Sequence, residues 1–228
     1  MKYIVIGLGN FGTALSARLT EMGHEVIGID QSKLRAQQCK DLITTTMSCD
    51  TNDIDALRSL PLSEADAVVV AIREDFGASV MTTALLKQLN VKKIIGRAIN
   101  DLHRTVLEAI GVSEVLSPEK ESAERFAKKL QLKGIHDSYS VTEKYQLIEY
   151  PVPEIYWGST LEEVNLEERF SVKLVTIKRN VPHKNLLGAI KEIPEIIPFI
   201  SPELILMDGD TFVVFGHINN LQEMTNFK

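Results

Sequence analysis

The sequence has few cysteines, no excess of positive charge and no long hydrophobic run. It contains two cysteines, Cys39 and Cys49, which excludes a disulfide framework and indicates a reducing compartment. Its 25 basic and 31 acidic residues give a formal net charge of −6, so the sequence does not predict binding of nucleic acid. No apolar run approaches the roughly 18–20 residues of a membrane span, and no signal peptide is predicted at the N-terminus. The sequence therefore predicts a cytoplasmic protein.

Apolar residues make up 44% of the 228 residues, which is enough for a substantial core. Short apolar runs predict strands at 2–6, 25–29, 44–47, 67–72, 93–97 and 114–116. Apolar positions at helical spacing lie between them, as in the series Phe11, Leu15, Leu19 and Met22. This alternation predicts an α/β fold with a Rossmann-like doubly wound parallel sheet.

The pattern changes near residue 132. We expect a nucleotide-binding domain over 1–132, a polar linker over 133–142 and a small α+β domain over 143–228. In the second domain, strands are predicted at 145–150, 172–177 and 211–215, and short helices at 161–164 and 219–224. The proline-containing stretch 180–203 predicts an irregular insertion or a short helix.

A glycine loop follows the first predicted strand and opens a helix. It reads Gly7-Leu8-Gly9-Asn10-Phe11-Gly12. In such a loop Gly7 permits the tight turn, Gly9 lets phosphates approach the backbone and Gly12 permits close packing of helix and strand. Because the free N–H groups of a helix N-terminus attract anions, the loop, including Asn10 and Phe11, predicts a nucleotide site. A Rossmann-like fold with an empty loop is the alternative.

Two aspartates after predicted strands are candidates for the nucleoside. Asp30 ends the second strand, where a carboxylate can accept hydrogen bonds from ribose hydroxyls. A carboxylate at this place disfavours a 2′-phosphate, and therefore NADP. Asp50 follows the third strand and either meets the adenosine or forms a helix cap or loop turn.

Further candidates lie where the fourth, fifth and sixth strands end. These are Ile72, Arg73, Arg97, Ala98 and Glu119. Ligands bind at the carboxyl ends of strands in open α/β sheets, so Arg97 could contact a phosphate. A solvated arginine at a strand end is an equally ordinary alternative. Ser117, Pro118 and Glu119 are typical of a helix start. Alternatively, Glu119 faces the phosphates through a cation.

The sequence does not predict a catalytic centre. None of its five histidines belongs to a metal-ligand or triad spacing: His24, His103, His136, His183 and His217. An NAD-dependent oxidoreductase would need a proton donor beside a substrate pocket. We therefore expect a protein that is not an enzyme, with an NAD(H)-binding redox sensor or oxidoreductase as the alternative.

The sequence resembles the TrkA/KtrA-type regulators of potassium uptake, in which an RCK (KTN) domain precedes a TrkA-C domain. The similar segments are 3–12, 23–30, 67–72, 84–87, 106–111 and Ser117-Pro-Glu-Lys120, and the resemblance covers nearly the whole chain. It implies a homo-oligomer, a dimer that assembles into an octameric ring, beneath a membrane-embedded potassium transporter or channel. It also implies exchange of ATP and ADP, or of NAD(H), as the gating signal at the inner face of the membrane.

The resemblance assigns roles residue by residue. Gly7, Gly9 and Gly12 would hold phosphates, Asp30 the ribose, and Asp50 with Ile72 the adenosine, while Glu119 would bind a divalent or monovalent cation. Ktr-type proteins often carry an arginine in the glycine loop where this chain has Asn10, which favours ADP or NAD over ATP. Some relatives bind cyclic di-AMP in the second domain, where Phe170–Ile177 and the following proline-rich segment could line a cleft.

Overall fold

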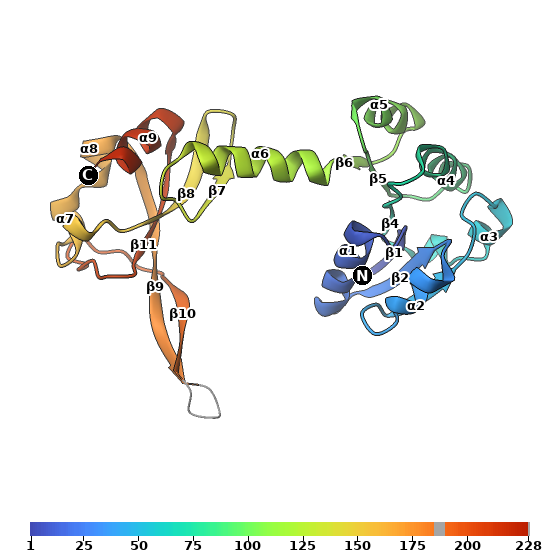
Figure 1. Ribbon diagram of the computed structural model, residues 1–228, viewed down its shortest axis with the longest axis horizontal. Helices are drawn as coiled ribbons and strands as arrows, with labels where there is room; N and C mark the ends of the chain where they lie inside the picture. The colour runs from blue at the N-terminus through green and yellow to red at the C-terminus, as the bar shows by residue number, and fades with distance from the viewer. Residues whose placement is uncertain (185–189, 228) are drawn as a thin grey trace. The chain divides into compact units, whose positions relative to one another are not determined.

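The computed structural model describes residues 1–184 and 190–227, in two compact units, Met1–Glu119 and Lys120–Lys228 (Figure 1). Helix α6 (Pro118–Gln131) begins at the end of the first unit and continues in the second. The domain limits expected from the sequence, with a linker over 133–142, stay a prediction. Among the described residues, none of the helices is long and apolar enough to cross a membrane.

The first unit is built on a parallel sheet with strand order β3-β2-β1-β4-β5-β6. The strands are β1 (Lys2–Ile6), β2 (Glu25–Asp30), β3 (Thr45–Ser48), β4 (Ala67–Val70), β5 (Ile94–Arg97) and β6 (Glu114–Leu116). All four residues of β4 are buried, as expected for a strand covered on both faces. The order reverses between β1 and β4, which confirms the predicted doubly wound sheet and places its crevice at the end of β1.

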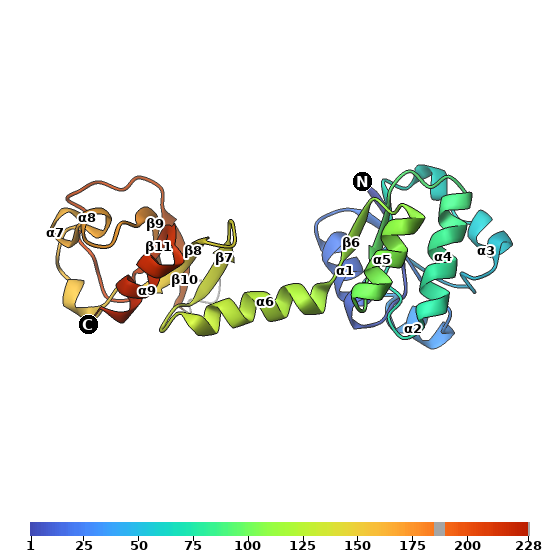
Figure 2. The same ribbon diagram turned by 90° about the horizontal axis from the view of Figure 1, so that it is seen from above.

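Helices connect these strands. They are α1 (Asn10–Glu21), α2 (Lys33–Gln38), α3 (Ile54–Arg58), α4 (Phe76–Gln88) and α5 (Asp101–Ile110), with a 3₁₀ turn at Leu62–Glu64. Side chains that accept hydrogen bonds from the first helical turn fix where α2 to α5 start: Ser32, Asp53, Asp75 and Asn100. Helices α4 and α5 lie side by side (Figure 2).

The second unit holds an antiparallel sheet with strand order β10-β9-β11-β8-β7. The strands are β7 (Asp137–Ser140), β8 (Tyr145–Pro151), β9 (Lys173–Lys184), β10 (Ile190–Ile197) and β11 (Thr211–His217). The remaining elements are a 3₁₀ turn at Glu154–Tyr156 and helices α7 (Leu161–Val164), α8 (Leu166–Phe170) and α9 (Ile218–Asn226). Phe212 and Val214 of β11 pack with Val164, Phe170 and Leu221 in one core, so the helices cover one face of this sheet.

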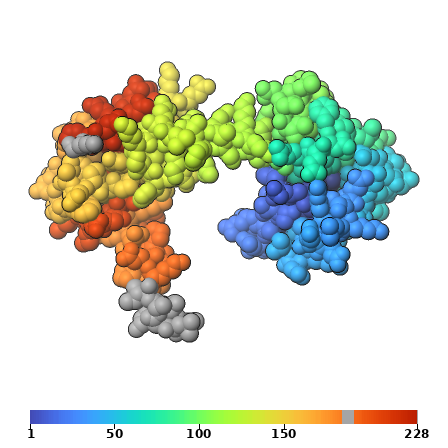
Figure 3. Space-filling view, viewed as in Figure 1, coloured from blue at the N-terminus to red at the C-terminus, as the bar shows by residue number. Residues whose placement is uncertain are grey.

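The expectation of an irregular insertion or short helix over 180–203 is wrong for 180–184 and 190–197, which are strands, whereas 198–203 is irregular as expected. Strand β9 runs to Lys184 and pairs with β10, and residues 185–189 lie outside the described residues. The hairpin projects from the sheet, as the ribbon and the space-filling view both show (Figures 1 and 3). Its prolines are compatible with strands. Pro194 lies on the edge strand β10, and Pro182 lies in the part of β9 that extends beyond its pairing with β11.

Helix α5 contains a fully buried histidine, His103, near its N-terminus. Its Nδ1 accepts a hydrogen bond from the backbone N–H of Ile99 at 3.4 Å, and its ring lies 4.7 Å from that of Phe76. Its Nε2 has no hydrogen-bond partner in the described part of the chain. Burial lowers the pKa of His103 below its usual value of 6.5.

We predict that protonation of His103 destabilises the first unit in mild acid. Because the folded-state pKa is depressed, the stabilising contribution is present above pH 6.5 and is lost as the pH falls below 6.5, by at most about 1.4 kcal/mol per pH unit. Urea unfolding followed by circular dichroism at several pH values measures this slope, which should decrease in His103→Gln.

The comparison uses the pH slope rather than the absolute stability, because the substitution is expected to destabilise the protein at every pH. Fluorescence of Trp157, the sole tryptophan, reports unfolding of the second unit and serves as an internal control. Equal slopes in the wild type and in His103→Gln would contradict the prediction.

Candidate functional site

The glycine loop connects β1 to α1 at the carboxyl edge of the first sheet. Gly7 has a φ of +97°, and a Cβ added there would lie 3.0 Å from the backbone nitrogen of Ile72. At Gly12 an added Cβ would lie 1.8 Å from the carbonyl oxygen of Gly7. The turn and the close approach of helix to strand therefore both require glycine, as the sequence motif predicts.

Gly9 is different, because no described atom would lie within 4 Å of a Cβ added there. It is the N-cap residue of α1, and no described side chain caps this helix end. The backbone N–H groups of the first turn are therefore available at an open surface. Together with the positive end of the helix dipole, they can hold an anion such as a phosphate.

Asp30 ends β2 beside this loop and is 7% exposed. Its Oδ2 accepts a hydrogen bond from the backbone N–H of Leu8, and its Oδ1 accepts one from Ser32, both at 2.8 Å. Each carboxylate oxygen retains acceptor capacity for a ribose hydroxyl. Asp30 thus fixes the loop and remains able to receive the predicted nucleoside.

Asp50 is exposed in the segment after β3, where its Oδ1 accepts a hydrogen bond from the backbone N–H of Asn52 at 3.0 Å. This contact forms a loop turn, and the cap of α3 is Asp53 instead. The contact of Asp50 with adenosine stays a prediction.

Ile72 and Arg73 follow β4. Ile72 is half-buried and packs its backbone against Gly7, just beyond the last paired residues of β1 and β4. Arg73 is exposed, and its Nε lies 3.7 Å from Oε1 of Glu119. The structure thus places the residues after β4 beside the glycine loop, as expected for strand ends at one edge.

Arg97 ends β5 and is a buried cation, 6% exposed. Its Nη2 donates a hydrogen bond to Oε1 of Glu119, and its Cζ lies 5.0 Å from the ring centroid of Phe11 in the first turn of α1. Its Nε is buried and has no hydrogen-bond partner among the described residues. Ala98 is also buried and donates its backbone N–H to Leu116 at 2.8 Å. A buried guanidinium with an unused donor beside an uncapped helix end suits an anionic ligand.

Glu119 lies at the start of α6 with its side chain 53% exposed. Partial burial alone would raise the pKa of Glu119, but its own backbone N–H, Arg97 and Arg73 outweigh this effect and hold the pKa below its usual value. The carboxylate is therefore ionised and paired with two guanidinium groups. No group of three or more potential metal ligands occurs among the described residues, and the cation role of Glu119 stays a prediction.

An ion pair not predicted from the sequence lies at the same edge. Nη2 of Arg35, in α2, donates to both carboxylate oxygens of Glu74, at 3.2 and 3.0 Å. Glu74 lies between β4 and α4, 39 residues away in the sequence, and no motif connects the two positions.

The segment predicted to line a cleft for cyclic di-AMP contributes mainly to the core of the second unit. Phe170, Val172 and Ile177 are buried there, whereas Val175 is 52% exposed. A ligand site on this segment stays a prediction.

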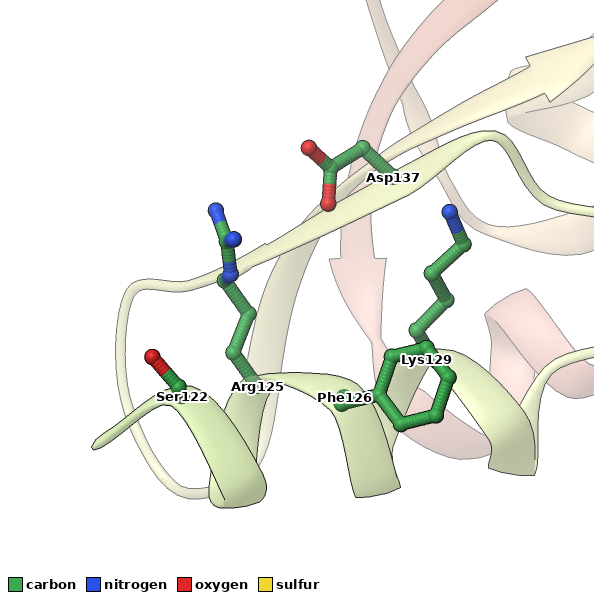
Figure 4. Close-up of a pocket in the computed structure, with 5 residues that line it drawn as sticks. All are labelled: Ser122, Arg125, Phe126, Lys129 and Asp137. Carbon is green, nitrogen blue, oxygen red and sulfur yellow. The ribbon is translucent and has the colours of Figure 1, made fainter. Parts of the chain in front are cut away.

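A separate depression of about 360 Å³ lies in the second unit between α6 and β7 (Figure 4). It is lined by Ser122, Arg125, Phe126, Lys129 and Asp137. The backbone N–H of Ser138 and the hydroxyl of Tyr139 lower the pKa of Asp137, and the charges of Arg125 and Lys129 add to this effect. This depression is lined by none of the residues predicted for the nucleotide site.

Comparison with known proteins places these observations in a family. The TrkA-N domain model matches residues 3–118. The chain is 30% identical over 220 residues to Ktr system potassium uptake protein C of Bacillus subtilis (strain 168), covering 96% of this chain and 94% of the relative. It is 27% identical over 225 residues to Ktr system potassium uptake protein A of the same organism, covering 99% and 96%.

Two solved structures share the fold. The GsuK channel bound to NAD matches with a TM-score of 0.62 at 14% identity, and the match covers 100% of this chain and 39% of that chain. The NAD(P)-binding domain of an exopolyphosphatase-related protein from Archaeoglobus fulgidus matches with a TM-score of 0.50 at 25% identity. That match covers 57% of this chain and 96% of the domain.

We predict that alanine at Gly12 and alanine at Gly9 change the stability of the first unit by different amounts. Gly12→Ala should destabilise the first unit by about 1–3 kcal/mol, because its Cβ would overlap the carbonyl of Gly7. Gly9→Ala should change stability by less than about 1 kcal/mol, because its Cβ meets open space. Denaturant unfolding followed by circular dichroism distinguishes the two, and equal stability of both variants would contradict this description of the loop.

Proposed function

Because this chain belongs to the TrkA-N domain family, we propose that it is a nucleotide-binding regulatory subunit that gates a membrane potassium transporter or channel. The main support for the nucleotide site is Arg97, which is buried beside the uncapped end of α1. Its Nε has no hydrogen-bond partner among the described residues. Phosphates would bind the first turn of α1 and Arg97, and Asp30 would accept the ribose hydroxyls. The role in potassium transport is supported by relatives named as Ktr system potassium uptake proteins, which align over nearly the whole chain.

The ligand proposed is ATP, ADP or NAD(H). Solved structures with this fold include the GsuK channel bound to NAD and GsuK bound to ADP. A terminal phosphate would extend toward Glu119, and the guanidinium groups of Arg73 and Arg97, which pair with Glu119, support this by providing positive charge. A cation at Glu119 would have to displace these guanidinium groups or share the carboxylate with them.

The protein would act by binding rather than by chemistry. A nucleotide shifts the equilibrium between two conformations only by its different affinities for them, so ligands that differ in charge can favour different states. The chain would work at the inner face of the membrane through its transporter partner, as a dimer within a ring.

The NAD(H)-linked alternative follows from the same crevice, because Asp30 and the glycine loop suit NAD equally well. Steady-state oxidation of NADH with a carbonyl substrate would support an oxidoreductase. Tight NADH binding without turnover, and without any effect on potassium flux, would support a redox sensor.

We predict that Arg97→Gln weakens the binding of ATP and ADP by about 10- to 100-fold, because a charge-assisted hydrogen bond to phosphate contributes about 1.5–3 kcal/mol. Isothermal titration of the nucleotide-free full chain measures this loss. Arg18→Gln, which removes an exposed arginine paired with Glu21 at the far end of α1, is the matched control and should bind as the wild type does. Unchanged affinity in a folded Arg97→Gln protein would remove Arg97 from the site.

The gating function is tested by potassium uptake. Cells that lack their own uptake systems would express a Ktr-type membrane subunit with the wild-type chain, without it, or with Asp30→Ala. We expect uptake to depend on the chain and to lose its nucleotide response in Asp30→Ala. Uptake that is indifferent to the chain, together with failure to co-purify with the membrane subunit, would contradict the proposed function.

A further inference from the structure

The Arg35–Glu74 ion pair joins two segments that flank the glycine loop. Arg35 lies in the helix after β2, and Glu74 lies in the segment after β4. Strand β1 lies between β2 and β4 in the sheet. A contact between the two segments therefore spans the carboxyl end of β1, where the loop begins.

Arg35 is also close to the carboxylate proposed to receive the ribose. Its Nη1 lies 4.0 Å from Oδ2 of Asp30, the oxygen that accepts the hydrogen bond from Leu8. A ribose hydroxyl bound to Asp30 would thus lie near a guanidinium group. In dinucleotide-binding folds, an arginine at such a place can accommodate a phosphate on the ribose 2′-oxygen.

In this chain, however, Arg35 is already paired with Glu74. Both carboxylate oxygens of Glu74 accept hydrogen bonds from the same nitrogen of Arg35. A 2′-phosphate would have to displace Glu74 and would also approach two carboxylates, Glu74 and Asp30. A ribose with a free 2′-hydroxyl meets neither obstacle and can donate to Asp30.

We propose that Glu74, through its hold on Arg35, is a selectivity residue that excludes nucleotides phosphorylated at the ribose 2′-position. This inference rests on the proposed nucleotide site and adds to it which nucleotides the site accepts. The accepted class comprises adenine nucleotides with free ribose hydroxyls, and the rejected class includes NADP and adenosine 2′,5′-bisphosphate.

The size of the effect follows from the exposure of the pair. The side chains of Arg35 and Glu74 are 43% and 76% exposed, so exchanging one anionic partner for another costs little. Glu74 should therefore account for a factor of about five to ten in affinity, chiefly through its occupation of Arg35. The buried carboxylate of Asp30 supplies the remaining discrimination.

The experiment is isothermal titration of the full chain with two ligand pairs that differ by the 2′-phosphate. The pairs are NAD⁺ with NADP⁺, and AMP with adenosine 2′,5′-bisphosphate. Glu74→Gln should strengthen binding of the 2′-phosphorylated member about five- to tenfold and change the other member by less than about twofold. The double variant Arg35→Gln/Glu74→Gln should lose this gain, because the freed guanidinium produces it.

Glu21→Gln is the control, since it removes one exposed carboxylate from another arginine pair at the opposite end of α1. Equal strengthening of both members by Glu74→Gln would overturn the proposal and indicate a barrier to every nucleotide. A gain that persists in the double variant would also overturn it, because charge removal alone would then be the cause. If the wild-type chain binds none of these four ligands, nor ATP or ADP, the proposed function itself fails. If the chain binds them but Glu74→Gln changes no affinity, only the selectivity role of Glu74 is refuted.

Discussion

The close approach of Gly12 to the carbonyl of Gly7 is the constraint on which the candidate site depends. It fixes where α1 begins relative to β1, so the free N–H groups of the first turn face the crevice beside β4. The hydrogen bond from Leu8 to Asp30 then joins the loop to the end of β2. Backbone packing therefore orients both the helix end proposed to bind phosphate and the carboxylate proposed to bind ribose.

The charges around this loop are balanced within the chain. Arginines and carboxylates from four strand ends pair there: Arg35, Arg73 and Arg97 with Asp30, Glu74 and Glu119. A phosphate that enters such a site exchanges with a carboxylate rather than neutralising a free cation. Affinity then depends on how readily each carboxylate is displaced, which differs between exposed Glu74 and partly exposed Glu119.

The sequence was sufficient for features that depend on local spacing. The strand–loop–helix unit over 2–21 and the position of Asp30 follow from the glycine pattern and from helical periodicity. The Arg35–Glu74 pair could not be predicted, because it joins residues 39 positions apart without a motif. The β9–β10 hairpin was missed for another reason: its prolines suggest irregular structure, and only the sheet order places Pro194 on an edge where no N–H is required.

Arg97 and Glu119 connect the crevice to α6. A buried guanidinium with an unused Nε is costly, and the partly exposed carboxylate of Glu119 offsets this cost incompletely. A phosphate at the end of α1 would supply the missing acceptor and compete with Glu119 for Arg97. Because Glu119 lies in the first turn of α6, a change in its pairing would be felt first at the start of this helix, most of whose residues belong to the second unit. By linkage, a partner whose affinity for the chain changes when the crevice binds its ligand would change the affinity of the crevice for that ligand by the same factor.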